Sequence, residues 1–543
     1  MSNGPVHQAL RTDFNARMLL STEQADIKCS ALGTQEMLRL LNDIFGTSLS
    51  FDHSELRALF ESFISLAIDF GTLFALVRTS WPSEYELPDQ GRSLEVDFLQ
   101  RLSGVEAGGS AHNSTRDGSI SGETIHSPYY IKPRRLRDLY AHRVVPFHYS
   151  LQEGGLVIPL YWAISHSWTD DMVGVDTPVN AYEWPVPLPK GMTLEAVRVE
   201  LIGLGAQYVW LDVLCLRQSS TDADKERKRR QEWSVDVPTI GTVYVSGAFR
   251  VVRYMNGLGR IFERCGWDHP RHWLNRAWTL QEMKYESIIG GVPHGVKDPL
   301  QQRSDESGEL LSERLSLVTE IETLQEGRTT ARHFMNIIAA MRRRHSTNPV
   351  DKIAGVAMLF HSASLPLYDE AKGEEAAWAL CIRHLPPALQ AELLFQFEHP
   401  GNNGITWCPS WNQLMTTEVP PELFLRTVVG MVKNIMPDGK ASYEGPVLTA
   451  YVTLQAEAVG STYRRAILKV QEDEFKVGIP LSVPDISEGQ YTLIGDELMW
   501  SWVLCITQGA LDYRKVTILR MSEAEADRLK DSNLYRRRRC RFA

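Results

Sequence analysis

The sequence predicts an α/β protein whose central part is a parallel β-sheet covered by helices on both faces. Between residues 156 and 289, short apolar runs of strand length alternate with segments of helical periodicity, which is the pattern of parallel β-α units. One of these runs, residues 207–216 (QYVWLDVLCL), is almost continuously apolar, as expected of a strand buried on both faces. The 543 residues leave room for further domains on either side of this sheet.

The region before the sheet, residues 1–130, is predicted to be helical. Apolar residues recur at helical spacing in residues 34–45 and 54–78. Residues 104–127, by contrast, are rich in glycine and serine and contain few apolar side chains. We therefore expect a flexible linker there and a domain boundary close to residue 130.

Four strands and the helices between them are expected in the central part. The strands are predicted at residues 156–165, 207–216, 249–255 and 286–289. A helix is expected after Thr193, whose hydroxyl suits an N-cap, and another over residues 273–284. Pro238 is expected to start or kink the helix in which it lies, because proline lacks a backbone donor.

The C-terminal half is expected to be an α+β region. Residues 301–415 are predicted to be mainly helical, with helices at 331–344 and 371–384. Residues 416–543 are predicted to be rich in β-structure, because residues 446–483 alternate between apolar and polar side chains.

Composition restricts the partners and the compartment. A net charge of −10 and a pI near 5.9 argue against nucleic acid as the partner, because phosphate neutralisation needs a clustered basic surface. The seven cysteines are odd in number and form no C-x-x-C pair, which is typical of a reducing compartment, so a cytoplasmic location is expected. No membrane association is expected, because Glu61 and Asp69 interrupt the longest apolar stretch, residues 60–77.

Four blocks of the central part resemble the HET (heterokaryon-incompatibility) domain family of filamentous fungi and follow one another in the family's order. They are residues 161–168 (YWAISHSW), 208–218 (YVWLDVLCLRQ), 233–248 and 276–282 (RAWTLQE). The resemblance implies a HET domain over residues 131–300 with a Rossmann/flavodoxin-like core, similar to that of TIR domains. The third block departs from the family, because Pro238 and Gly241 stand inside what is usually a continuous helix.

The resemblance also implies a function. HET-domain proteins act in fungal non-self recognition, or in innate-immune-like signalling that ends in growth arrest or cell death. Some of the similar TIR domains cleave NAD with one glutamate, and Glu282 stands at the matching position. NAD would then be a substrate, and no bound cofactor is expected. The alternative is a non-catalytic scaffold that self-associates or docks protein partners, which the lack of a recognisable phosphate loop favours.

The residue types around Glu282 suit the cleavage of a nicotinamide riboside. A carboxylate near the ribose stabilises an oxocarbenium-like transition state, and an indole can stack on a flat base. If residues 273–284 form a helix, Trp278 shares a face with Glu282. Ser165, Trp168 and Asp212 lie near the carboxyl ends of the first two predicted strands, where open α/β sheets bind ligands, so they are candidate ribose or phosphate contacts.

Each of these residues also has a purely structural interpretation. Trp168 and Trp278 are of a type that more often anchors a core, and Asp212 could cap a loop. Glu282 could form an ion pair with Arg276.

Other motifs in the sequence carry little. Cys265, His269 and His272 have ligand-like spacing, but a fourth ligand is missing, so no metal site is expected. The basic run at residues 535–541 could be a localisation signal or a patch for an acidic partner, although terminal charge runs are usually only solvated.

Overall fold

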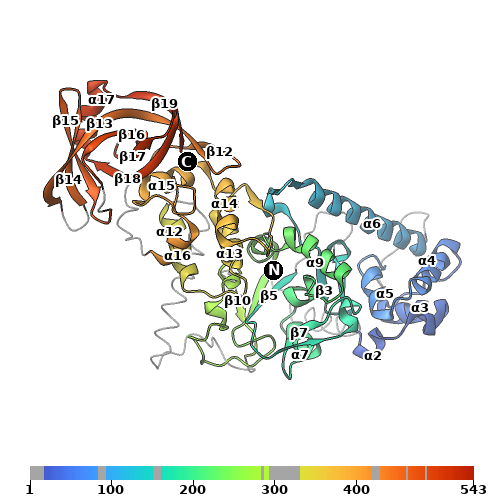
Figure 1. Cartoon of the computed structure of the whole chain (residues 1–543). Coiled ribbons are helices and arrows are strands. Elements are labelled where there is room, and N and C mark those ends of the chain that lie inside the picture. Colours follow the sequence, from blue (N-terminus) through green and yellow to red (C-terminus); the bar gives the residue numbers. More distant parts are fainter. Residues whose placement is uncertain are drawn as a thin grey trace, which may run out of the picture. The chain divides into compact units, whose positions relative to one another are not determined.

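The computed structural model (Figure 1) describes residues 18–82, 93–150, 161–282, 287–292, 331–417, 428–459, 463–483 and 486–542. The chain divides into two compact units, Met1–Leu315 and Ser316–Ala543. Both combine helices with β-sheet, so the protein is of the mixed α/β kind. In the ranges that the structure describes, no helix is both long and apolar enough to cross a membrane.

The first unit is built on a six-stranded sheet with the order β10-β9-β5-β8-β3-β4. Four neighbouring strands are parallel: β10 (Ser287–Ile289), β9 (Arg250–Tyr254), β5 (Trp162–His166) and β8 (Tyr208–Leu211). The hairpin of β3 (Arg135–Asp138) and β4 (Arg143–Pro146) adds to β8 in the antiparallel direction. The sheet is therefore mixed, whereas the sequence predicted a parallel one. The sequence analysis missed the hairpin because arginines such as Arg137 and Arg143 are fully buried in it. Charged residues at buried positions interrupt the alternation of apolar and polar side chains that predicts a strand.

Numbered in chain order, the four parallel strands lie in the spatial order 2-1-3-4. Their positions confirm the predicted strands over the residues that the structure describes, although β8 is shorter than expected. It ends at Leu211, and Asp212–Cys215 form a short helix, α8. The apolar run continued beyond the strand because Val213, Leu214 and Cys215 are buried as well.

The predicted helix after Thr193 is confirmed, and the predicted interruption at Pro238 takes another form, because one helix ends before the proline and the next begins after it. Helix α7 (Leu194–Gly203) begins at the N-cap Thr193, whose hydroxyl accepts a hydrogen bond from the Ala196 amide at 3.1 Å. Helix α9 (Ala223–Asp236) ends just before Pro238. The chain then continues as the one-turn helix α10 (Ile240–Thr242) and a π-helical turn, η4 (Val243–Gly247).

The helix predicted at residues 273–284 is wrong over its described part. Two short 3₁₀ turns stand there instead, η5 (Trp273–Asn275) and η6 (Trp278–Leu280). Side chains bind the backbone in place of helical hydrogen bonds: the Asn275 amide donates to Trp267 O at 2.6 Å, and the Thr279 hydroxyl donates to Trp273 O at 2.6 Å. The helix face that was to hold Trp278 beside Glu282 therefore does not exist.

The N-terminal region is helical, as predicted. Its helices are α2 (Thr22–Ala25), α3 (Cys29–Phe45), α4 (Ser54–Ser65) and α5 (Phe70–Val77). Their apolar side chains, among them Phe60 and Phe74, belong to the same hydrophobic cluster as the residues of the central sheet. The buried side chains of this core thus come from both sides of residue 130.

The linker predicted at residues 104–127 is wrong, because residues 104–118 belong to the 25-residue helix α6 (Leu94–Gly118). The segment has few apolar side chains, but contacts with distant residues stabilise it as a helix. Arg116 is buried, pairs with the Asp236 carboxylate and donates to Lys132 O. Gly109 lies so close to the His148 ring that a Cβ atom there would be 2.6 Å from its Nε2. The glycine that suggested a linker is instead required by close packing.

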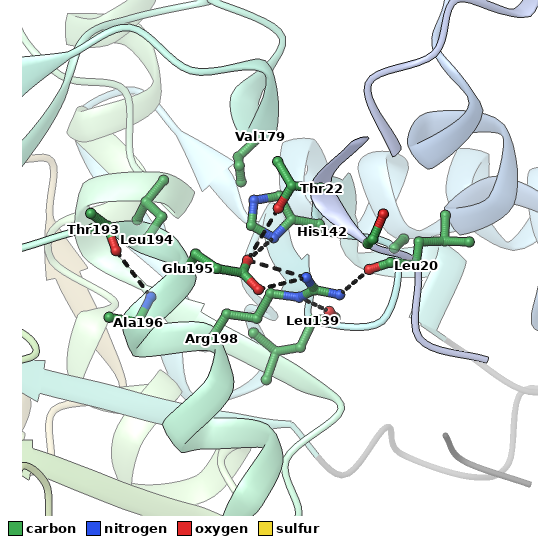
Figure 2. Close-up of polar contacts among 12 residues, drawn as sticks. Leu20, Thr22, Leu139, His142, Val179, Thr193, Leu194, Glu195, Ala196 and Arg198 are labelled. Carbon is green, nitrogen blue, oxygen red and sulfur yellow. Dashed lines mark hydrogen bonds and ion pairs between the residues drawn. The ribbon is translucent and has the colours of Figure 1, made fainter. Parts of the chain in front are cut away.

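Figure 2 shows how the N-terminal segment is attached to α7. The buried Arg198 guanidinium donates to Leu20 O and to Leu139 O, both at 2.6 Å, and pairs with the Glu195 carboxylate at 3.1 Å. His142 Nδ1 lies 3.2 Å from the same carboxylate. Burial, together with nearby arginines, lowers the pKa of His142 to about 2. Its imidazole is therefore neutral, and the contact with Glu195 is not an ion pair.

The described part of the second unit, from residue 331 on, starts with helices and continues as β-structure, as the periodicity of its sequence predicts. The helices are α12 (Ala331–Arg342), α13 (Asp351–Ala357), α14 (Glu374–His384), α15 (Pro387–Gln396) and α16 (Trp411–Thr416). They are followed by β12 (Val432–Ile435), β13 (Ala441–Val459), β14 (Tyr463–Val470), β15 (Asp473–Pro480), β16 (Gly489–Gly495), β17 (Ser501–Thr507), β18 (Asp512–Met521), α17 (Glu523–Ser532) and β19 (Arg536–Phe542). The buried side chains of these strands and of α17 form a separate hydrophobic cluster, which includes Trp502 and Leu504.

The basic run near the C-terminus is a strand and not a solvated tail. It forms β19, which pairs with β13 and β18. Arg537 forms an ion pair with Glu497 at 2.6 Å, and Arg541 forms one with Asp512 at 2.7 Å, while Cys540 and Phe542 are buried. Pairing with distant strands, which the sequence does not reveal, gives this segment its structure.

Candidate functional site

The structure brings most of the predicted site residues together at the carboxyl edge of the parallel strands. Ser165 is the second-last residue of β5, and Trp168 follows that strand by two residues. Asp212 directly follows β8, and Glu282 comes two residues after η6. Parallel strands end at the same edge of a sheet, which is why residues distant in sequence meet there.

Glu282 is hydrogen-bonded inside this cluster. The Ser165 hydroxyl donates to Glu282 Oε2, and the indole of Trp273 donates to Ser165 Oγ at 2.6 Å. All three side chains are buried, with relative exposures of 9%, 1% and 0% for Glu282, Ser165 and Trp273. Sequence reasoning missed Trp273, because it assigned the residue to a helix and so gave it no reason to point at β5.

A second set of contacts holds Asp212. His166 Nε2 lies 2.7 Å from Asp212 Oδ1, and the Trp168 indole donates to Asp212 Oδ2 at 2.9 Å. His166 Nδ1 lies 3.0 Å from Ser167 O, which can only accept. Because both ring nitrogens face acceptors, both carry hydrogen, and His166 is an imidazolium paired with a carboxylate. Its place at the end of a parallel strand was the available signal for His166, and the sequence analysis overlooked it.

The environment separates the titration of the two acids. Burial raises the pKa of Glu282 to about 7, against the opposing hydrogen bond from Ser165. Burial would also raise the pKa of Asp212, but the charge and hydrogen bond of His166 outweigh it and lower that pKa. For His166, burial alone would lower the pKa, but the charge of Asp212 and its hydrogen bond outweigh burial and raise it. Near neutral pH, Asp212 is thus ionised, whereas Glu282 titrates close to neutrality.

Two further residues near Glu282 in sequence, Arg276 and Trp278, differ in their contacts. Trp168, Asp212, Arg276 and Trp278 are all partly exposed. The Arg276 guanidinium lies 5.8 Å from the centre of the Trp168 ring, and its charge opposes the rise in the pKa of Glu282. Trp278 packs against the hydrophobic core. The cluster therefore has a buried carboxyl group and a partly exposed rim with the Trp168 indole, the Asp212 carboxylate and the Arg276 guanidinium.

Metal ligands are not gathered at this site. Within the described ranges, no three His, Cys, Asp or Glu side chains are grouped so that they could hold a metal ion. Cys265 instead contacts Glu263 at 3.5 Å, and the ring of His272 packs edge-on to Trp267.

Comparison of the chain with protein-family models, with curated proteins and with solved structures finds no match. The functional argument therefore rests on the residues of the site.

Proposed function

We propose that this chain is a fungal HET-type protein of non-self recognition, whose central sheet carries an NAD-cleaving site with Glu282 as the catalytic carboxylate. The observation that supports this most is the convergence of Glu282, Ser165 and the Asp212–His166 pair at one edge of the sheet. The parallel strands have the order 2-1-3-4, as in flavodoxin-like sheets. In such sheets ligands bind beyond the carboxyl ends of strands 1 and 3, here β5 and β9. Ser165 is at that end of β5.

The proposed reaction hydrolyses the bond between the ribose C1′ and the nicotinamide nitrogen. That bond breaks with its electron pair going to the ring, so the cationic nicotinamide leaves as a neutral molecule and needs no proton. The ribose becomes oxocarbenium-like, and the Glu282 carboxylate stabilises this positive charge. Water then forms the new bond to C1′ and gives its proton to Glu282.

The partly exposed rim supplies the binding groups in this proposal. The partly exposed Trp168 indole, held by Asp212 through its N–H, is the group that would stack with a flat ring. Arg276 supplies a cation for the pyrophosphate. His166 neutralises Asp212, so Glu282 is the one carboxylate of the cluster that is left to face a cationic sugar.

The test is NAD loss with product analysis in cells that express the full chain or a variant. Glu282→Gln and Glu282→Ala are expected to reduce nicotinamide release by at least about 100-fold, the usual size of a lost catalytic group. Glu263→Gln, which changes an exposed carboxylate, is the matched control and should behave as the unaltered chain. Growth arrest that occurs without NAD loss and persists in both Glu282 variants would establish the self-associating scaffold instead.

A further inference from the structure

The hydrogen bonds that reach the ionised Glu282 have a fixed direction. An indole nitrogen has a hydrogen and no free lone pair, so it can only donate. Ser165 Oγ must therefore accept from Trp273, at 2.6 Å, and when Glu282 is ionised the single hydrogen of Ser165 is directed at Glu282 Oε2. In the ionised acid Oε2 is thus occupied as an acceptor. Oε1 is then the oxygen left for a substrate.

The indole that starts this chain of hydrogen bonds is itself held in place. Arg253 stands directly opposite Ser165 in the pairing of β5 with β9, and its guanidinium lies 5.0 Å from the centre of the Trp273 ring. Trp273 also begins η5, where the His272 ring accepts from the Leu274 amide at 3.3 Å. The Trp273 side chain is fully buried, so neither its ring nor its N–H is free to turn toward solvent.

We propose that Trp273 and Ser165 are positioning residues, which hold Oε2 of the ionised Glu282 as an acceptor and present Oε1 to the ribose. This inference rests on the proposed function for its role in the reaction, but the direction of the hydrogen bonds does not. It distinguishes Ser165 from the direct ligand contact that the sequence suggested, because its only hydrogen is used within the protein.

Removing the donors should make Glu282 harder to ionise. Ser165→Ala deletes the hydrogen bond to the carboxylate, and the midpoint of Glu282 ionisation should rise by about one pH unit or more. Trp273→Phe keeps a ring in place but frees the serine hydroxyl to rotate, so a smaller rise is expected. A midpoint one unit higher reduces the ionised fraction at pH 7 about fivefold, and activity should recover near pH 9.

The experiment follows Glu282 in two ways in the full-length chain. The infrared absorption of its protonated carboxyl group is obtained as the difference between each chain and its Glu282→Gln counterpart, from about pH 5 to about pH 9. The pH profile of NAD loss is measured in parallel. Trp184→Phe and Ser150→Ala are the controls, because both side chains are also buried and donate to backbone oxygens.

The two measurements separate the possible failures. A higher infrared midpoint in Ser165→Ala and Trp273→Phe, with no change in the controls, supports the positioning role even if no NAD is consumed. In that case only the proposed function fails. An unchanged infrared midpoint in both variants overturns the positioning role, whatever the activity.

Discussion

Ionisation of Glu282, which the proposed reaction requires, lowers the stability of the folded chain. Burial raises its pKa from the ordinary 4.5 to about 7 in the folded chain. Between these values the folded state holds a proton that the unfolded state has released, so stability falls as the pH rises from about 4.5 to about 7. Glutamine cannot ionise but still accepts from Ser165. Glu282→Gln should therefore be more stable than the unaltered chain at pH 8, by about 1–3 kcal/mol, and nearly equal to it at pH 5.

Urea unfolding followed by tryptophan fluorescence at the two pH values tests this expectation. The comparison between pH values within one variant removes any constant effect of the substitution on packing. An equal difference between the two chains at pH 5 and pH 8 would mean that the pKa of Glu282 is not raised.

At the scale of elements, α6 shows how tertiary packing decides the state of a glycine-rich segment. Gly104 and Gly109 both lie within this helix, but a Cβ atom at Gly104 meets nothing within 4 Å, whereas one at Gly109 meets the His148 ring. Gly104→Ala should stabilise the first unit by about 0.5–1 kcal/mol, because alanine restricts the unfolded chain and favours the helix. Gly109→Ala should destabilise it by about 1–3 kcal/mol through overpacking.

Thermal unfolding of the two variants provides the measurement, and each serves as the control for the other. The helix would be wrongly assigned if both substitutions changed the midpoint in the same direction by the same amount, since a solvated linker would not distinguish the two positions.

At the scale of the whole molecule, the chain contains two compact units with their own hydrophobic clusters. Phe60 is fully buried in the first cluster and Trp502 in the second. We expect two unfolding transitions in calorimetry, because each unit has its own core. Trp502→Ala and Phe60→Ala should each lower one transition only, by a free energy of about 3–5 kcal/mol. A single transition that both substitutions lower equally would show one cooperative unit.

Local signals in the sequence were sufficient for much of the fold. The strands β5, β9 and β10 follow from short apolar runs, α7 follows from the cap at Thr193, and a helix interruption at Pro238 follows from the proline itself. Each of these features depends on side chains within a few residues, which is why the sequence alone predicts them. The candidate acids were predicted in the same way, from their places near strand ends and from the resemblance to HET domains.

Tertiary structure decided the rest, because the deciding contacts join residues far apart in the chain. Helix α6 is held by Arg116 on Asp236, 120 positions away, and no local pattern indicates that pairing. The bonds of Ser165 with Glu282 and with Trp273 span 117 and 108 positions. Sequence determined which residues stand at the ends of the strands; folding determined that Glu282 is buried, and burial is what brings its pKa close to neutrality.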